Sequence, residues 1–297
     1  MARLSERLPE NEGGLFFVDT SCIDCDLCRQ IAPGVFARAD RPGQSYVRRQ
    51  PRTDEERLRA GMALATCPTS SIGTAEKVDL RPALEALPER VEDEVSFCGF
   101  AAESSFGASS YFIQRPGGNV LVDSPRWAGS LVKKLEAMGG VSLMFLTHQD
   151  DVADHERYAA HFGCRRVIHR ADAGRFSSSF ETVDGDAPVS LAPDLLVIPV
   201  PGHTRGSAAL LYRDRFLFTG DHLAGADEGD GLEAWPSVCW YSWTEQTRSM
   251  ERLLDLRFEW VLPGHGRRLH APAEQMRRHL EALVGWMRGR RGRAGRG

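Results

Sequence analysis

The chain has 297 residues, of which 42% are hydrophobic and 26% charged, and its formal net charge is -4. This composition is typical of a globular protein with one large domain or two, and the negative charge argues against a protein that coats nucleic acid. No apolar run approaches the about 18 residues that a membrane span requires. The opening segment, MARLSERLPENEGG, lacks the apolar core of a secretory signal. We therefore expect a cytoplasmic protein that binds neither nucleic acid nor a membrane.

The first feature along the chain is a group of cysteines. Cys22, Cys25 and Cys28 are separated by two-residue gaps, and Cys67 follows at a distance, directly before Pro68. Gaps this short let one loop occupy three corners of an iron–sulfur cube, while the fourth ligand comes from elsewhere. A structural zinc site with four cysteine ligands is the alternative, although zinc sites usually take their ligands as two pairs. The pattern favours an iron–sulfur site.

This segment resembles a single-cluster ferredoxin over about residues 15–75. The phrases CIDCDLC, APGVF and CPTSSIG carry the resemblance. It implies one [4Fe-4S] cluster, held by all four of these cysteines in a ferredoxin-like α+β domain. The sequence leaves open whether the cluster transfers electrons or is only structural.

The next elements follow from periodicity. A helix is expected over residues 55–68, and residues 76–95, with Pro82, Pro88 and many charges, are typical of a linker. Further helices are expected over 124–140, after a cap at Ser242 and after Pro272. Short apolar runs predict strands at 109–113, 119–123, 141–147, 165–169, 194–200, 208–212, 215–220 and 260–264.

Strands that mix with helices predict an α/β layered domain. We expect three parts: a cysteine-rich domain with its linker over 1–90, the α/β domain over 91–285 and a disordered Arg/Gly-rich tail over 286–297.

Five polar groups stand where predicted strands end. They are the segments 147–155, 201–207, 219–222 and 262–266 and, more weakly, 119–123. Strand ends can aim side chains into one cleft, and imidazoles with carboxylates suit a cation such as Zn, Fe or Mn. His169 and His222 lie nearby, and we expect them to support ligands or to lie on the surface. The pattern predicts a metal site.

The order of these groups resembles the metallo-β-lactamase fold superfamily over roughly residues 95–280. The resemblance implies a four-layer αβ/βα sandwich with two metals at one edge. The family's first motif, T-H-x-H-x-D-H, is matched at His148 and at Asp154 and His155. Asp150 stands where the second His is expected, and two extra residues precede Asp154.

The resemblance also implies a ligand set for two divalent metals, Zn or Fe. The first metal would be held by His148, Asp150 and His203, the second by Asp154, His155 and His265, with Asp221 between them. Asp151 is an alternative to Asp150. Asp154 and Asp221 are the candidate catalytic carboxylates.

Two dications that share a water would make hydroxide available near neutral pH, which predicts a metal-dependent hydrolase with metal-bound hydroxide as its nucleophile. Its small-molecule substrate is not specified by the sequence. The alternative is an iron-dependent redox enzyme, of dioxygenase or reductase type, that receives electrons from the [4Fe-4S] cluster and from a redox partner protein. A docking scaffold without catalysis is a third hypothesis.

The segment 235–243 is rich in aromatic residues, with three Trp and one Tyr beside Cys239. It is either a loop folded onto the core or an apolar wall of the substrate pocket.

Overall fold

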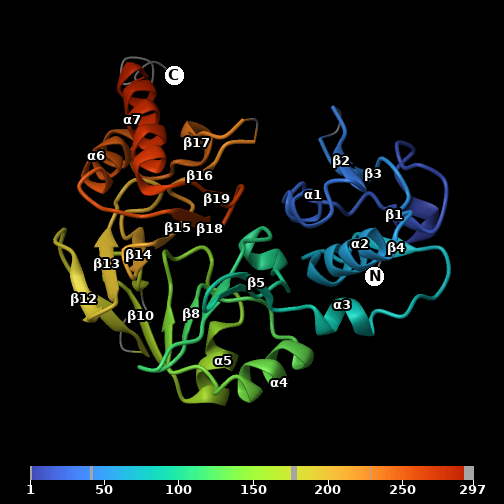
Figure 1. Cartoon of the computed structure of the whole chain (residues 1–297), viewed down its shortest axis with the longest axis horizontal. Helices are drawn as coiled ribbons and strands as arrows, with labels where there is room; N and C mark the ends of the chain where they lie inside the picture. The colour runs from blue at the N-terminus through green and yellow to red at the C-terminus, as the bar shows by residue number, and fades with distance from the viewer. Residues whose placement is uncertain (1, 41–42, 175–178, 228, 291–297) are drawn as a thin grey trace. The chain divides into compact units, whose positions relative to one another are not determined.

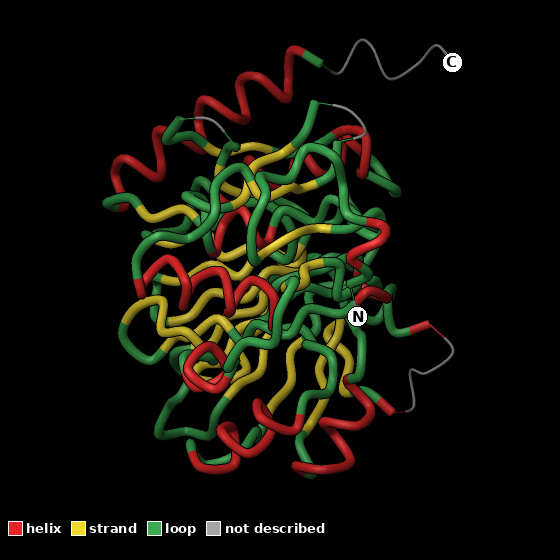
Figure 2. The backbone as a smooth tube through the Cα atoms, turned by 90° about the vertical axis from the view of Figure 1, so that its right-hand side faces the viewer, coloured by secondary structure: helices red, strands yellow, loops and turns green. Residues whose placement is uncertain are grey.

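The computed structural model describes residues 2–40, 43–174, 179–227 and 229–290. Figure 1 shows the path of the chain with its helices and strands. The chain divides into two compact units. The first comprises Met1–Val141 and Ala153–Phe162, and the second comprises Ser142–Val152 and Gly163–Gly297. Their helices and strands are marked in Figure 2.

The first unit opens with the cysteine-rich segment. Strand β1 (Phe16–Val18) pairs antiparallel with β4 (Ile72–Thr74), and β2 (Phe36–Arg38) pairs antiparallel with β3 (Ser45–Val47). The short helices η1 (Leu4–Glu6) and α1 (Leu27–Ile31) and the longer α2 (Asp54–Thr66) complete it. Two β-ribbons with helices between them form the α+β arrangement expected from the sequence.

Helix α2 delivers the last cysteine. The Thr53 side chain accepts a hydrogen bond from the Glu56 N–H, and the Glu56 side chain accepts one from the Thr53 N–H, so the helix begins with a complete capping box. The helix ends at Thr66, because Pro68 disfavours helical backbone at Cys67. A defined start and stop therefore fix the position of Cys67.

The rest of the first unit is an antiparallel meander with helices. It consists of α3 (Arg81–Glu85), β5 (Glu89–Glu92), β6 (Val95–Phe97), η2 (Glu103–Ser105), β7 (Tyr111–Ile113), β8 (Val120–Val122), α4 (Gly129–Ala137) and α5 (His155–Phe162). Residues 76–95, expected to be a linker, thus contain α3, β5 and the start of β6, and the expected boundary at residue 90 falls inside β5. The sequence did not predict β5 because its charged residues show little alternation of apolar and polar side chains, and none of them is fully buried.

The second unit holds two groups of strands. Strands β9 (Leu143–Phe145), β10 (Arg165–His169) and β11 (Glu181–Val183) pair in parallel. A six-stranded sheet has the order β12-β13-β14-β15-β18-β19. Its strands are β12 (Val189–Ala192), β13 (Leu195–Pro199), β14 (Ala208–Tyr212), β15 (Phe216–Gly220), β18 (Trp260–Pro263) and β19 (Leu269–His270). The ribbon β16 (Ala224–Gly225) with β17 (Leu232–Glu233) and the turn η4 (Pro236–Val238) lie between β15 and β18 along the chain.

Two helices cover one face of the six-stranded sheet. They are α6 (Trp243–Leu253) and α7 (Ala273–Gly289), and the core between them and the sheet includes Leu211, Leu217, Met250 and Leu280. Helix α7 continues through residues 286–289, which were expected to belong to the tail. Residues 291–297 of that expected tail lie outside the described residues.

Strand direction in this sheet decides where the site forms. Strand β15 is parallel to β18, and β13 runs in the same direction because β14 is antiparallel to both β13 and β15. The carboxyl ends of β13, β15 and β18 therefore meet at one edge, where the loops that follow them bring their side chains together. Among the described residues, no helix is long and apolar enough to cross a membrane.

Candidate metal centre and cluster site

Four of the five cysteines of the first unit, Cys22, Cys25, Cys28 and Cys67, line one pocket. Cys22 and Cys25 come from the loop before α1, Cys28 from α1 itself and Cys67 from the end of α2. Their neighbours in the pocket wall are Val18, Ile23, Leu27, Ser45, Thr69, Ser71 and Ile72. The structure therefore gathers all four predicted cluster ligands around one space with a largely apolar lining.

The surroundings of these sulfurs fit an anionic cluster. Burial raises the pKa of Cys28 and raises that of Cys25 to about 12, so free thiolates there would be costly. Yet the Ser71 N–H donates to Cys67 Sγ at 3.3 Å, and backbone groups of Asp24 and Leu27 bond to the sulfurs of Cys22 and Cys25. Donors aimed at buried sulfurs suit thiolates that bind metal.

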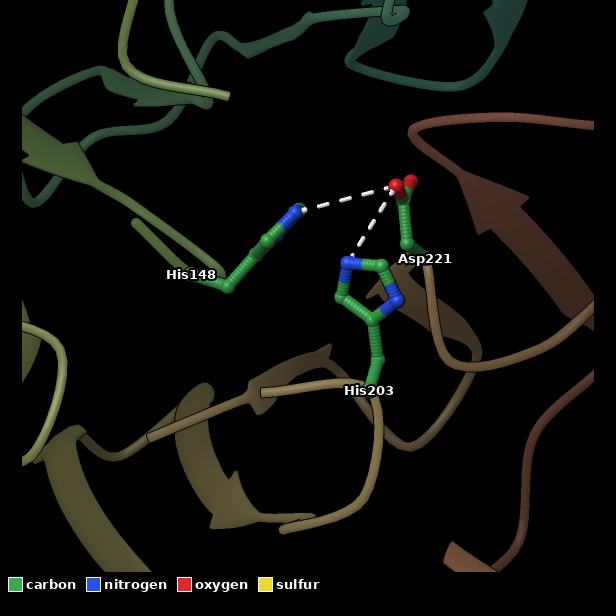
Figure 3. A group of neighbouring side chains, drawn as sticks. All are labelled: His148, His203 and Asp221. Atoms are coloured by element: carbon green, nitrogen blue, oxygen red, sulfur yellow. Dashed lines mark ion pairs between the residues drawn. The ribbon is translucent and has the colours of Figure 1, made fainter. Parts of the chain in front are cut away.

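The candidate metal centre of the second unit is built on the loops after β9, β13, β15 and β18. His148, His203 and Asp221 form one group whose ligand atoms all lie within 4.8 Å of one another. Figure 3 shows both rings directed at the Asp221 carboxylate, with Nε2–Oδ2 distances of 3.7 Å for His148 and 3.6 Å for His203. With metal–ligand bonds of about 2.1 Å, a tetrahedral site has edges of about 3.4 Å. The group is close to that geometry.

Both imidazoles offer a nitrogen to a cation. His203 Nδ1 lies 2.6 Å from the Val238 carbonyl oxygen, which can only accept, so Nδ1 carries the proton and Nε2 has a free lone pair. The Nε2 atoms of His148 and His203 are buried and have no hydrogen-bond partner in the described part of the chain. Burial lowers the pKa of His148, which keeps this ring neutral, as a metal ligand must be.

A second group forms around the same aspartate. Asp151, Asp221 and His265 also have ligand atoms within 4.8 Å of one another, and His265 Nδ1 lies 2.7 Å from Asp221 Oδ1. Burial alone would raise the pKa of Asp221, but the nearby imidazoles, His265 first, hold it below its ordinary value. Asp221 therefore stays ionised between the two groups, which is the position expected for it.

Asp150 lies beside the first group. Its Oδ2 is 3.5 Å from His203 Nε2 and 3.9 Å from His148 Nε2, and its side chain is 45% exposed. Its interaction with the His203 imidazole lowers its pKa. The carboxylate expected in place of a second histidine is thus close enough to serve as a ligand.

Asp154 and His155 take no part in either group among the described residues. Asp154 Oδ2 instead accepts a hydrogen bond from the Trp127 N–H at 2.6 Å, and His155 is buried as the first residue of α5. The buried carboxylate of the second group is Asp151, which the sequence offered only as an alternative to Asp150. The sequence did not distinguish Asp151 from its neighbour Asp150, because spacing alone does not tell toward which group each carboxylate points.

Other residues of the second unit hold or flank the site. Asp172 is buried and accepts hydrogen bonds from Gln149 N, Thr204 Oγ1 and Gly206 N. A Cβ atom at Gly264 would lie 2.5 Å from Asp151 Oδ2 and 2.9 Å from Asp221 Oδ1, so a larger residue there would displace these carboxylates. His222 is buried, and burial lowers its pKa to about 3. His169 bonds to the Gly185 carbonyl.

The aromatic segment lies along the His203 loop. The N–H groups of Trp240 and Tyr241 both donate to the His203 carbonyl at 3.0 Å. The Trp240 ring centroid is 6.3 Å from that of His203, and the residue is 67% exposed. The segment therefore presents an exposed aromatic surface beside the candidate metal ligands instead of folding entirely onto the core.

Comparison with known proteins accounts for both parts of the chain. Residues 18–74 match the family model of the 4Fe-4S single cluster domain of Ferredoxin I, which confirms the domain expected from the cysteine spacing. A hydroxyacylglutathione hydrolase of Cereibacter sphaeroides is 38% identical over 127 residues, which cover 41% of this chain and 49% of that protein. An uncharacterised protein of Bacillus subtilis, YobT, is 34% identical over 94 residues, covering 29% and 40%. The chain spans about half the length, or less, of these curated relatives.

Solved structures identify the fold. The chemotaxis sensor ODP, solved as its peroxy diiron species, matches with a TM-score of 0.50 and 18% identity, covering 68% of this chain and 94% of that one. The DIM-1 metallo-β-lactamase matches with a TM-score of 0.49 and 16% identity, covering 67% and 96%. The chain therefore carries the ferredoxin-type iron–sulfur domain that its cysteine spacing implied, and it shares the fold of the chemotaxis sensor ODP over 68% of its length.

Proposed function

We propose that the protein is a metal-dependent hydrolase of the metallo-β-lactamase fold that carries a [4Fe-4S] domain. The observation that carries the proposal is the convergence of His148 Nε2, His203 Nε2 and Asp221 Oδ2 at distances of 3.6 and 3.7 Å, with both imidazole nitrogens buried and unpartnered in the described part of the chain. Buried polar atoms without partners are costly, so a cation is the natural partner of this set.

Each side chain has a part in this proposal. His148, Asp150 and His203 would hold one divalent metal, Zn or Fe, and Asp151 with His265 a second one, with Asp221 shared. A metal held there would lower the pKa of a water molecule toward about 7 and so supply the nucleophile. The Asp150 carboxylate is 45% exposed and ionised, so it is placed to accept a proton as well as to serve as a ligand.

The substrate class follows from the curated relatives. A hydroxyacylglutathione hydrolase is 38% identical over 127 residues, which supports a small-molecule thioester as the substrate. The exposed aromatic surface at Trp240 and Tyr241 supports a substrate with an apolar acyl or leaving group.

The test is hydrolysis of a thioester panel, beginning with an S-acyl glutathione, by metal-loaded protein. We expect His203→Ala and Asp221→Asn to lose more than about 100-fold in kcat/KM, because each removes a ligand. His270→Ala is the matched control, since His270 is an exposed histidine of the same unit that stacks on Trp260. Absence of hydrolysis across the panel, or equal rates for His203→Ala and parent, would reject the proposal.

The second candidate is an iron-dependent redox enzyme. The carboxylate of Asp150 favours it, because two imidazoles with carboxylates are a ligand set that suits iron. The ferredoxin-type domain gives such an enzyme a source of electrons, which a partner protein would have to supply to the cluster.

Metal analysis of protein purified without air separates the two candidates. The hydrolase predicts about four iron and two zinc per chain, and the redox enzyme predicts five or six iron with little zinc. Thioesterase activity that persists after the cluster is bleached supports the hydrolase, and activity that needs a reductant supports the redox enzyme.

A further inference from the structure

Arg126 is a half-buried cation whose hydrogen-bond partners are all neutral. Its Nε donates to the Ala101 carbonyl at 3.1 Å and its Nη2 to the Ala65 carbonyl, and the guanidinium lies 5.5 Å from the centre of the Phe100 ring. No ion pair joins it to a carboxylate within the described ranges of the chain. Removing a guanidinium from water without a counter-charge is energetically costly. We therefore expect an anionic group near Arg126 in the functional protein.

One of these neutral partners stands close to a ligand of the cluster site. Ala65, which binds the guanidinium, stands two residues before Cys67 at the end of α2. Burial lowers the pKa of Arg126, and the charge of the Cys67 sulfur acts in the opposite direction. Once thiolates and iron occupy the pocket, the net negative charge of the cluster supplies the missing counter-charge.

The backbone holds Arg126 in this place from both sides. Its N–H donates to the Phe100 carbonyl at 2.9 Å, and its own carbonyl accepts from the Tyr158 hydroxyl at 3.1 Å. These bonds fix the backbone of Arg126, and the side-chain bonds to the Ala101 and Ala65 carbonyls hold its guanidinium beside the end of α2.

Arg29 offers an informative contrast. It also acts on the charges of Cys25 and Cys28, but it pairs with Asp24 at 2.8 Å and with Asp26 at 2.5 Å. These two carboxylates cancel its charge. Of Arg29 and Arg126, Arg126 is the one that brings a positive charge without a carboxylate partner among the described residues.

We propose that Arg126 is the counter-charge of the [4Fe-4S] cluster and raises its reduction potential. Reduction adds one electron to an already anionic group, and a fixed cation beside a ligand sulfur favours the more negative product. Arg126 is thus a positioning residue for the charge of the cluster. The proposal does not depend on hydrolysis, so the two stand or fall separately.

The test is a dithionite titration of the full-length, cluster-loaded protein with redox mediators, followed by EPR. We expect Arg126→Gln to lower the equilibrium constant for one-electron reduction about tenfold, which corresponds to about 59 mV. Arg126→Lys keeps the charge, and we expect it to stay within about twofold of the parent. Arg57→Gln removes an exposed arginine that pairs with Asp54 on α2 and is expected to change nothing.

Iron and sulfide analysis shows whether each variant is loaded. A loaded Arg126→Gln protein whose potential lies within about twofold of the parent overturns the proposal. If Arg126→Gln folds but does not load while Arg126→Lys loads, the positive charge is needed to hold the cluster and the proposal stands. If neither variant loads, the shape of the guanidinium matters and not its charge, and the proposal is overturned.

Discussion

Asp172 is one buried carboxylate that contacts both loops carrying candidate metal ligands. Its oxygens accept from Gln149 N at 3.1 Å, next to His148, and from Gly206 N at 2.7 Å and Thr204 Oγ1, close to His203. Asp172→Asn keeps the shape but replaces one acceptor by an NH2 group that faces a donor. We expect metal affinity to fall about 10- to 100-fold, measured by competition with a chelator.

The matched control is Asp184→Asn in the same unit. Asp184 is exposed and pairs with Arg170 at 2.7 Å, and we expect no change in metal affinity. Parent-like metal binding by Asp172→Asn would show that the loops hold their ligands without this carboxylate.

Trp240 is the residue at which the proposed substrate preference is most easily tested. Its ring lies beside His203, yet the residue is 67% exposed, so a substrate can cover it. We expect Trp240→Ala to raise KM for an apolar thioester about tenfold with little change in kcat, because apolar contact area is lost equally in the ground and transition states. Trp286→Ala, at an exposed tryptophan on α7, should leave both constants unchanged. A fall in kcat at constant KM would assign Trp240 to the chemistry instead.

Among the candidate ligands, the sequence located the loops better than the individual carboxylates. His148, His203, Asp221 and His265 follow strand ends and reach the two groups, as expected from the resemblance. The choice among the aspartates depends on backbone turns such as the left-handed φ of +29° at Ala153. Spacing in the sequence does not encode such a turn, so Asp151 rather than Asp154 in the second group could not be foreseen.

At the scale of elements, the capping box of α2 is expected to support the cluster site. Thr53→Ala removes the side chain that accepts from Glu56 N, and an N-cap substitution of this kind costs about 1 kcal/mol in the free energy of unfolding. Thermal unfolding of the loaded protein should show a lower midpoint, since Cys67 stands at the other end of this helix. Thr53→Ser retains the cap and should unfold like the parent. Equal midpoints for Thr53→Ala and parent would mean that tertiary packing alone fixes the helix.

The elements that periodicity predicted are those with a clear apolar face. Strands β10 and β14 have the bounds expected, and α6 begins after the Ser242 cap, whose side chain accepts from Glu245 N at 3.2 Å. Strand β5 was missed because three of its four residues, Glu89, Arg90 and Glu92, are charged and none of the four is fully buried. Such a strand is stabilised by its hydrogen bonds to β6. These backbone bonds do not produce a periodic pattern of apolar residues in the sequence.

For the whole molecule, the cofactor and the fold are expected to be thermodynamically linked. Burial raises the pKa of Cys25 to about 12 in the folded apoprotein, whereas an unfolded thiol ionises near pH 8.5. Between these values the folded chain keeps a proton that the unfolded chain has lost, so stability is complete below about pH 8.5 and falls as pH rises toward 12. In the loaded protein the sulfur binds iron as a thiolate and does not titrate in this range.

We therefore expect the unfolding midpoint of the apoprotein to fall between pH 8 and pH 10.5, and that of the anaerobically loaded protein to change much less. Differential scanning calorimetry of both forms at the two pH values measures the difference. Cys25→Ser apoprotein is the control, because a hydroxyl does not ionise there and its midpoint should fall less steeply. If the loaded and apo forms lost the same stability over this range, groups outside the cluster pocket would govern the alkaline transition. Iron binding at Cys25 would then not be linked to the stability of the fold.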